Sequence, residues 1–459
     1  MHPDTILRRT YGGEKSDRDL GFLNMSENEF KKEIWSVCPV CLKKIPAALE
    51  RSPGREGIWL RKTCPEHGFF EVPVWKDRFD FDEWTEGETA LSREDEVHCI
   101  GNCRSCSFHL QECCCVILEV TKACNLHCPY CFAFGGESSR MPGADELKAS
   151  IDIITEKGGS PLLQLSGGEP TLRDDLPELV RYGKEKGCSY LQVNTNGIRI
   201  AEDEAFAKAL ADAGLDIVFL QFDGTDDDVY RKLRGRELFD IKKKAIENCS
   251  RHGLSVTLVP TVVRGINDDK LGSIVDFAIS CFPAVRAVHF QPVTYLGRYP
   301  HDGQDRITLD ELMETLCMQT GIDPVSLLPS RCDHALCEFH GTYIVNREGK
   351  LMPTSNRKYF AKKKRSSASE NREFVAGHWT GSSEDLSREV SESMDFDSFI
   401  YNMTHRSMTI SAMAFQDAMD LNLERMARCS LLVYEEGKLL PFCGKYLTPA
   451  EEKAGNEKK

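Results

Sequence analysis

The chain has 459 residues, of which 41% are hydrophobic and 28% charged, and its formal net charge is −14. This length predicts two or three domains of a soluble globular protein. The acidic balance disfavours bulk nucleic-acid binding, which needs many Lys and Arg side chains to neutralise phosphates. No stretch approaches the roughly 18 apolar residues of a transmembrane helix, and the first residues lack the apolar core of a signal peptide, so we expect a cytoplasmic location.

Twenty cysteines would suit a disulfide scaffold in a small secreted protein, but here they form tight local groups with the spacing of metal ligands. In residues 34–80, the pair Cys38 and Cys41 is followed by the pair Cys64 and His67. Two such pairs suit one tetrahedral metal in a small β-ribbon, and the histidine favours zinc somewhat over iron. The alternative is two unrelated pairs. We interpret the acidic residues 79–96 as a linker.

A second cysteine segment covers residues 97–115. Cys99, Cys103 and Cys106 have the spacing C-x3-C-x2-C, and Cys113, Cys114 and Cys115 follow. Because four thiolates close a [4Fe–4S] cube, we expect an auxiliary cluster here. Its fourth ligand is one of the three neighbouring cysteines, and we choose Cys114.

Residues 116–300 alternate between short apolar runs and amphipathic segments with helix start and stop signals. The pattern predicts six β-α repeats and therefore a parallel sheet, which we expect to curl into a partial (β/α)6 barrel. The carboxyl ends of the strands would meet at one mouth, where parallel barrels place their functional sites. The predicted strands are 116–120, 162–165, 191–194, 217–222, 256–262 and 288–293, and the helices between them include 174–187, 206–214, 241–253 and 268–278.

Polar residues and glycines follow each predicted strand. Turns are commonly polar, which explains any one of these segments but explains six in succession poorly. We therefore expect them to surround one cavity. They are CNLHCPYC at 124–131, SGGEP at 166–170, NTNG at 194–197, QFDG at 221–224, Pro260-Thr261 and Gln291-Pro292.

The run CNLHCPYC places Cys124, Cys128 and Cys131 directly after the first strand. Three thiolates leave one iron of a cube without a protein ligand, and an open position can bind a small molecule. A zinc knuckle or an ordinary ferredoxin loop is the alternative. The spacing, with Tyr130 beside the third cysteine, resembles the signature of the radical S-adenosylmethionine (radical SAM) enzymes.

That resemblance implies that S-adenosylmethionine chelates the open iron and is cleaved on reduction to a 5′-deoxyadenosyl radical. SGGEP matches the segment that holds the methionine amino group in this family, with Gly167 and Gly168 allowing close backbone approach and Glu169 accepting a hydrogen bond. By the same resemblance, the other cofactor-binding residues are Tyr130, Asn194, Asn196, Gln221, Asp223, Thr261 and Gln291.

Residues 301–450 predict a C-terminal auxiliary cluster and substrate region. Cys332 and Cys337 precede a hairpin-like run at 343–352, and Cys429 and Cys443 flank another at 431–440. Four thiolates are enough for one more [4Fe–4S] cluster, and buried free cysteines are the alternative.

The methionine-rich stretch 403–423 is either flexible apolar surface for a substrate or an amphipathic core helix. The isolated residues Cys188, Cys249, Cys281 and Cys317 we interpret as core.

The order of these motifs from Cys38 to Cys443 resembles one branch of the superfamily, the archaeal tetraether lipid synthases, formerly described as methyltransferases acting on 7,8-dihydro-6-hydroxymethylpterin. The branch carries one mononuclear Zn or Fe and three [4Fe–4S] clusters, one catalytic and two auxiliary. The resemblance implies C–C bond formation between unactivated lipid tails, contact with a membrane surface and an electron donor such as ferredoxin or flavodoxin. Candidates for headgroup binding are Arg298, His301 and the basic run from Lys362.

Two other functions stay open. The first is radical C-methylation of a pterin or another small heterocycle, which the sequence does not separate well from lipid coupling. The second is an iron–sulfur electron carrier without chemistry of its own, for which SGGEP at a strand end has little use.

Overall fold

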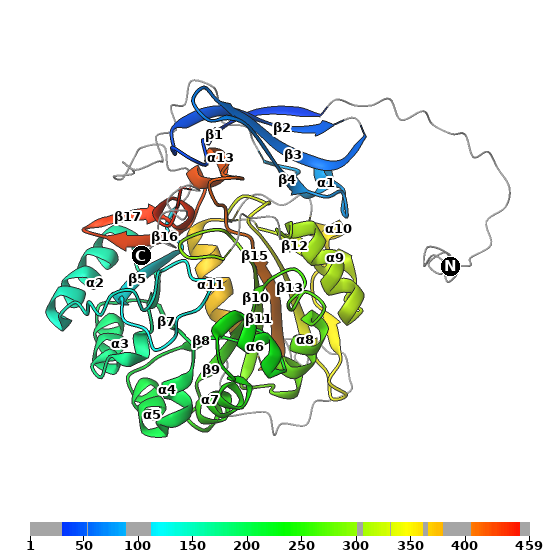
Figure 1. The fold of residues 1–459 in the computed structure, drawn as a ribbon. Coiled ribbons are helices and arrows are strands. Elements are labelled where there is room, and N and C mark those ends of the chain that lie inside the picture. Colours follow the sequence, from blue (N-terminus) through cyan, green and yellow to red (C-terminus); the bar gives the residue numbers. More distant parts are fainter. Residues whose placement is uncertain are drawn as a thin grey trace.

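The computed structural model describes residues 30–52, 54–88, 112–300, 306–330, 332–360, 366–379 and 405–449. This part of the chain forms a small N-terminal sheet and a large curled sheet with helices around it (Figure 1). The expected α/β class, with a partial barrel and a small β-ribbon, is confirmed. Most of the predicted 97–115 segment, including Cys99, Cys103 and Cys106, lies outside the described residues.

The small sheet is antiparallel and follows chain order: β1 (Lys31–Val37), β2 (Lys44–Ser52), β3 (Arg55–Cys64) and β4 (Gly68–Trp75). The short helix α1 (Phe81–Trp84), capped by Asp80, packs Phe81 and Trp84 on Trp75, each with ring centroids 5.9 Å apart. The Trp84 Nε1 donates to Ala335 O at 2.9 Å. Residues 79–88 are therefore a packed junction, and the predicted linker is wrong there.

All six predicted strands are present and parallel. They are β5 (Cys115–Thr121), β6 (Leu162–Gly167), β7 (Tyr190–Thr195), β8 (Ile217–Gln221), β9 (Ser255–Val259) and β11 (Val285–Pro292), with β10 (Thr261–Val262) pairing beside β11. Their near-continuous burial is typical of strands covered on both faces. Two strands from the C-terminal region extend the parallel set: β15 (Ser407–Met413) joins β11, and β16 (Leu431–Glu435) joins β5.

The helices between these strands lie on the outside of the curled sheet (Figure 1). The predicted helices at 174–187, 206–214, 241–253 and 268–278 are confirmed as α3, α5, α7 and α8, and Asp175 and Asp203 are the N-caps of α3 and α5. The connecting elements are α2 (Ala144–Gly158), η1 (Pro170–Leu172), α3 (Leu176–Glu185), α4 (Ile198–Glu202), α5 (Glu204–Asp212), α6 (Asp227–Arg234), α7 (Phe239–Arg251) and α8 (Leu271–Ser280).

The C-terminal region supplies the two predicted hairpins. The first pairs β13 (Glu338–Val345) with β14 (Leu351–Pro353), and the second pairs β16 with β17 (Lys438–Pro441). Of the two interpretations of residues 403–423, the amphipathic core helix is wrong for residues 407–413, because they form β15, whose cross-strand partners are β11 and β13. The other elements are α9 (Leu309–Thr320), η2 (Pro324–Ser326), β12 (Leu328–Pro329), α10 (Arg357–Phe360), α11 (Ala368–Trp379), α13 (Leu423–Ala427) and α14 (Phe442–Lys445).

The small sheet docks on the loop between β15 and α13. Ser36 Oγ donates to Leu421 O at 2.6 Å, and the Lys62 Nζ donates to Ala418 O at 2.7 Å. Lys32 pairs with Glu424 at 2.7 Å. Burial lowers the pKa of Lys62 to about 8, although Asp420 and Asp417 nearby oppose this shift. The N-terminal sheet is therefore fixed to the segment that precedes Cys429.

Candidate active site

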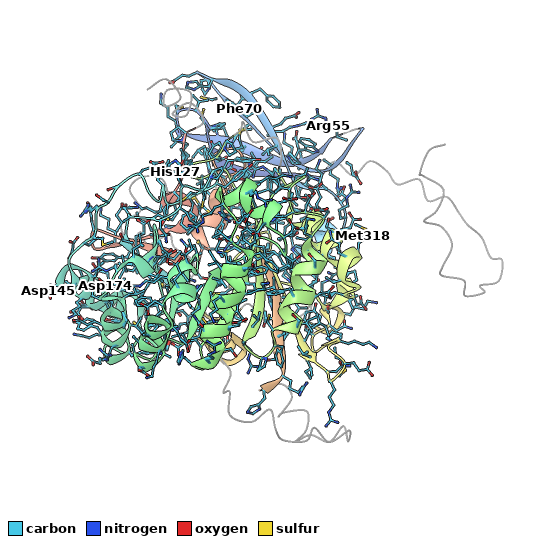
Figure 2. All side chains as sticks on the ribbon, turned by 60° about the horizontal axis from the view of Figure 1, so that its bottom comes forward. Arg55, Phe70, His127, Asp145, Asp174 and Met318 are labelled. Atoms are coloured by element: carbon cyan, nitrogen blue, oxygen red, sulfur yellow. The ribbon has the colours of Figure 1, made fainter. Side chains whose placement is uncertain are left out.

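The loop after β5 carries the three cysteines of CNLHCPYC into a cavity of about 350 Å³. Cys124 Sγ accepts from Leu126 N at 3.4 Å, and Cys131 Sγ accepts from Gly135 N at 3.3 Å. Figure 2 shows His127 of this loop on the side of the barrel where the small sheet with Phe70 lies. The cysteines stand at the carboxyl end of the first parallel strand, where barrel chemistry is expected.

Arg298 fastens this loop. Its backbone N and O bond to Cys131 at 2.9 Å each, its Nε donates to Cys128 O at 2.8 Å, and its Nη2 donates to Gly135 O at 3.1 Å. Gly297 before it has φ +60°, and an added Cβ would lie 2.5 Å from Cys131 O. The Arg298 guanidinium is engaged with the loop, and its role in headgroup binding stays a prediction.

The glycines of SGGEP accommodate this same loop. A Cβ on Gly167 would lie 2.1 Å from Thr121 O, and one on Gly168 would lie 2.1 Å from Ala123 O. Gly168 N donates to Thr121 O at 2.8 Å, and Glu169 N donates to Ala123 O at 2.8 Å. The close backbone approach that we expected for a ligand is therefore made by the chain itself.

Glu169 is 1% exposed and joins the ends of β6 and β7. Its Oε1 accepts from Thr171 N at 3.1 Å, Thr171 Oγ1 at 2.6 Å and Thr195 Oγ1 at 2.6 Å, and its Oε2 accepts from Asn196 N at 2.8 Å. This carboxylate was expected to accept from an ammonium. In the structure two of its four hydrogen bonds come from Thr171, which follows β6, and two come from Thr195 and Asn196 at the end of β7. The carboxylate therefore holds these two strand ends together.

Nine of the ten predicted cofactor-binding residues line the cavity. Asn196 Nδ2 donates to Asn125 Oδ1 at 2.7 Å, which ties the end of β7 to the cysteine loop, and Asn194 Nδ2 donates to Gln164 Oε1 at 3.1 Å. Asp223 is the exception, because it is fully buried behind the cavity wall. The lining residues are Tyr130, Gly167, Gly168, Glu169, Asn194, Asn196, Gln221, Thr261 and Gln291.

Arg234 and Lys242 are two residues of this site that sequence reasoning missed. Arg234 lines the cavity, as Cys128 does, and donates from Nη2 to Thr261 Oγ1 at 2.9 Å. The Lys242 Nζ donates to Gln221 Oε1 at 2.9 Å, and burial lowers its pKa to about 7. Each cation lies on the buried face of its helix, and that unusual position was a signal in the sequence.

The cysteine loop fits an iron–sulfur cube. Burial raises the pKa of Cys124 to about 12, so its thiol ionises near neutral pH only when a metal binds it. Within the described residues, Cys124, Cys128 and Cys131 do not form a group whose ligand atoms all lie within 4.8 Å of one another, as a single ion would require. In a cube each thiolate binds a different iron, so wider spacing is expected.

The N-terminal pairs converge on one point. The ligand atoms of Cys38, Cys41, Cys64 and His67 all lie within 4.8 Å of one another, and His67 Nδ1 is 3.6 Å from Cys38 Sγ and 3.4 Å from Cys64 Sγ. Burial raises the pKa of Cys64, but hydrogen bonds from His67 and the backbone outweigh it and lower the value to about 6. Three sulfurs and one imidazole nitrogen suit a tetrahedral zinc or iron ion.

The remaining predicted ligands are only partly described. Cys114 and Cys332 belong to one buried apolar cluster. Cys337 Sγ accepts from Arg425 Nε at 3.4 Å, and Cys443 Sγ accepts from Gln416 N at 3.3 Å. The isolated Cys188 and Cys249 are buried in the core, as expected.

Comparisons with known proteins agree with this geometry. Residues 118–278 match the model of the radical SAM superfamily, and residues 30–76 match the HMPTM N-terminal zinc ribbon domain. The 7,8-dihydro-6-hydroxymethylpterin dimethyltransferase of Methanocaldococcus jannaschii is 34% identical over 356 residues, which cover 70% of this chain and 70% of that protein.

The fold, the three-cysteine loop and the match to the superfamily model together define this chain as a radical SAM enzyme. Within that superfamily, the chain belongs to the same family as the M. jannaschii protein. The Fe-coproporphyrin III synthase of Methanosarcina barkeri is 38% identical over 151 residues, which cover 32% of this chain and 36% of that enzyme. The solved structure of Streptococcus suis SuiB bound to S-adenosylmethionine matches with a TM-score of 0.36 and 17% identity, over 43% of this chain and 44% of SuiB.

None of the helices that the structure describes is both long and apolar enough to cross a membrane.

Proposed function

We propose that this enzyme joins unactivated carbon atoms, and that those carbons belong to the hydrocarbon tails of lipids. One feature carries the proposal. Phe132 follows Cys131 and Phe442 precedes Cys443, and their ring centroids lie 5.1 Å apart. Phe415 stacks on Phe442 with centroids 4.2 Å apart. All three rings line the cavity, so an aromatic wall connects the catalytic cysteine loop to the C-terminal cysteines.

A hydrocarbon tail suits this wall because it buries apolar surface there without leaving polar groups unpaired. Ile117, Leu296 and Met413 continue the apolar lining beside the three rings. The rings also pack on Tyr446, whose hydroxyl donates to Glu119 Oε1 at 3.1 Å. The wall can therefore hold a flexible tail in a fixed path and exclude water from the reacting carbons.

Cys124, Cys128 and Cys131 would hold a [4Fe–4S] cluster, which together with S-adenosylmethionine would supply the radical chemistry needed at an unactivated carbon. Residues of the chain itself position the cysteine loop and place charge beside it. Arg298 and Asn196 hold the cysteine loop, and Arg234 places a buried positive charge beside Cys128. We also propose an external electron donor such as ferredoxin or flavodoxin, and peripheral contact with a membrane surface from which lipid is taken.

A second candidate is radical C-methylation of a pterin or a similar heterocycle, as the name of the M. jannaschii relative suggests. Polar groups in the cavity favour it. The buried Thr409 Oγ1 has no hydrogen-bond partner among the described residues, and Gln164, Gln192 and Glu338 also line the lumen. Burial raises the pKa of Glu338 to about 7, so this carboxyl can donate or accept a hydrogen bond near neutral pH.

The two candidates give different products. Reconstituted, reduced enzyme is incubated without oxygen with S-adenosylmethionine and either a diether lipid with saturated isoprenoid tails or 7,8-dihydro-6-hydroxymethylpterin. Lipid coupling yields a product that has lost two hydrogen atoms per new bond, with two molecules of 5′-deoxyadenosine. A methylated pterin, heavier by one CH2, with no joined lipid would replace the first candidate with the second.

A pair of cavity variants sharpens the choice. If the tail lies on the aromatic wall, Phe442→Ser lowers joined lipid per 5′-deoxyadenosine formed, and Thr409→Val leaves that ratio unchanged. Thr409→Val lowers methylated product instead if a heterocycle uses its hydroxyl. Cys128→Ala abolishes 5′-deoxyadenosine formation in either case, and Cys249→Ala, at a buried but isolated cysteine, retains it.

A further inference from the structure

Two residues beside the N-terminal metal ligands pack into the apolar cluster that contains the aromatic wall of the cavity. Val37 precedes Cys38 and is fully buried in this cluster. Leu42 follows Cys41 and packs against it. The three rings of the wall belong to the same packed group: Phe132, Phe415 and Phe442. The chain at the metal ligands and the cavity wall therefore share one continuous apolar interior.

Hydrogen bonds from the small sheet reach the loop at residues 414–422, which connects β15 to α13. Ser36 Oγ donates to Leu421 O at 2.6 Å. The Lys62 Nζ donates to Ala418 O at 2.7 Å and to Ser36 Oγ at 3.1 Å. Ser36 is fully buried and Lys62 is 3% exposed, so water cannot replace these bonds unless the interface opens.

Both donors stand close to metal ligands along the chain. Ser36 lies two residues before Cys38 at the end of β1, and β3 ends with Lys62 two residues before Cys64. In the sheet β2 lies between β1 and β3, so no backbone ladder joins these two strands. Because the ligand atoms all lie within 4.8 Å of one another, one bound ion would join the two strand ends directly. The metal is therefore expected to fix the spacing of the two donors.

The 414–422 loop connects these donors to the cavity. Gln416 Oε1 accepts from Asn422 N at 2.7 Å, which closes the loop on itself. Its neighbour Phe415 lines the cavity and stacks on Phe442 with ring centroids 4.2 Å apart. A shift of the loop therefore moves a ring of the aromatic wall.

The barrel holds the same loop independently. Arg306, which precedes α9, pairs with Asp417 at 2.6 Å and with Asp420 at 3.0 Å. Tyr295 N donates to Asp417 Oδ2 at 3.1 Å. These bonds remain when the small sheet loosens, so loss of the metal is expected to widen the motion of the loop and not to release it.

We propose that the N-terminal metal site positions the aromatic wall of the substrate cavity, and that Ser36 and Lys62 are the positioning residues that connect the two. The inference rests on the proposed function only in taking the aromatic wall to bind substrate. Without the metal the ends of β1 and β3 separate more easily, and Phe415 no longer holds substrate in one place. Radical formation continues, because the contacts of Arg298 and Asn196 hold the cysteine loop.

The connection is tested by hydrogen exchange in the loaded enzyme, without substrate and without oxygen. The backbone N–H groups of Asp417, Met419 and Asn422 each donate to a side chain of the loop and report on its opening. Ser36→Ala is expected to speed their exchange by about fivefold, the factor that corresponds to one net hydrogen bond, with the N-terminal metal retained. Lys62→Met is expected to act in the same direction.

His67→Ala, which lowers metal occupancy, is expected to speed exchange at the same groups, while β6 and β7 exchange as in the wild type. Lys44→Met, at an exposed lysine of β2, is the matched control and should change nothing. Unchanged exchange in the 414–422 loop of both Ser36→Ala and His67→Ala overturns the proposal, and so does faster exchange spread evenly over the barrel. If Lys62→Met does not fold, these two variants still decide.

The effect on substrate is tested by the yield of joined lipid per 5′-deoxyadenosine formed. Ser36→Ala is expected to lower this ratio while cluster iron and the rate of 5′-deoxyadenosine formation stay those of the wild type. An equal loss of 5′-deoxyadenosine would show general damage to the enzyme and contradict the positioning role. Hydrogen exchange uses neither lipid nor pterin. If the wild type joins no lipid, the proposed function fails and the exchange data alone decide this inference.

Discussion

The carboxylate of Asp223 holds the guanidinium of Arg234 at two points, with Nε 2.7 Å from Oδ2 and Nη2 2.8 Å from Oδ1. Asp223 is fully buried, whereas Arg234 reaches the cavity and Cys128. Asp223 of the QFDG segment therefore affects the cavity through Arg234 and does not line it directly. This aspartate fixes the cation that faces the cofactor cavity.

Replacing Asp223 by Asn is expected to destabilise the enzyme by about 3–5 kcal/mol, because it leaves a buried guanidinium without its counter-charge. The urea midpoint of the loaded protein, measured without oxygen, checks the value. Glu204→Gln, which removes the exposed partner of Arg251 at 2.9 Å, is the matched control and should change the midpoint little. A small effect of Asp223→Asn would show that Arg234 does not depend on this pair.

Gly168→Ala is expected to displace the catalytic loop, because the new Cβ would lie 2.1 Å from Ala123 O. We expect loss of bound iron and of 5′-deoxyadenosine formation, even though the substitution adds only one methyl group. Gly143→Ala is the control, since an added Cβ there meets nothing within 4 Å and its φ is −65°. Equal iron content in both variants would contradict the expected clash.

Because Lys242 is buried, the free energy of unfolding is expected to depend on pH. Burial lowers its pKa in the folded state from 10.5 to about 7, so between these values the unfolded chain binds more protons. Stability from this residue therefore rises with pH across that window, by at most about 1.4 kcal/mol per pH unit. Urea midpoints at pH 7.5 and pH 9.5 should rise more in the wild type than in Lys242→Met. Parallel changes in the two proteins would rule out a neutral buried lysine.

Removing the N-terminal metal is expected to loosen the small sheet. His67→Ala deletes one of four converging ligands, so bound zinc or iron at this site should fall and proteolysis within residues 30–76 should speed up. His252→Ala, at a histidine outside the metal group, is the control for loss of an imidazole. Metal analysis and limited proteolysis measure the two effects. Full metal occupancy in His67→Ala would exclude this histidine as a ligand.

The parallel strands could be predicted from sequence because each is a short apolar run, followed by a polar segment and a helix with clear end signals. The strands that cover the two edges of the sheet could not be predicted in this way. β15 pairs with β11 and β16 pairs with β5 across more than a hundred residues of chain, and such pairing leaves no local pattern. The stretch 403–423 therefore offered a helix as one of its two interpretations, although Ser407–Met413 forms a strand.

The residues of the functional sites also divide into those that the sequence could predict and those that it could not. Cys38, Cys41, Cys64 and His67 were predictable because each pair is a short motif with metal-ligand spacing, and the turns β1–β2 and β3–β4 of one small sheet bring the two pairs together. The contacts of Cys332, in an apolar cluster with Cys114, and of Cys337, beside Arg425, were not, since they depend on which segment each thiol meets in space. Glu169 was expected to bind a ligand, and only the structure reveals that its carboxylate also accepts two hydrogen bonds from the end of β7.

The placement of β15 and β16 has a consequence for how the molecule forms. These strands are made after all six predicted strands, and they cover the two outer strands β11 and β5. Until β15 has been synthesised, both edges of the central sheet expose unpaired backbone groups, and the β5 edge stays exposed until β16 follows; such edges are prone to pair with other chains. A fragment that ends near residue 300 therefore contains the cysteine loop and SGGEP but should aggregate, and loading of the catalytic cluster should await the last tenth of the chain.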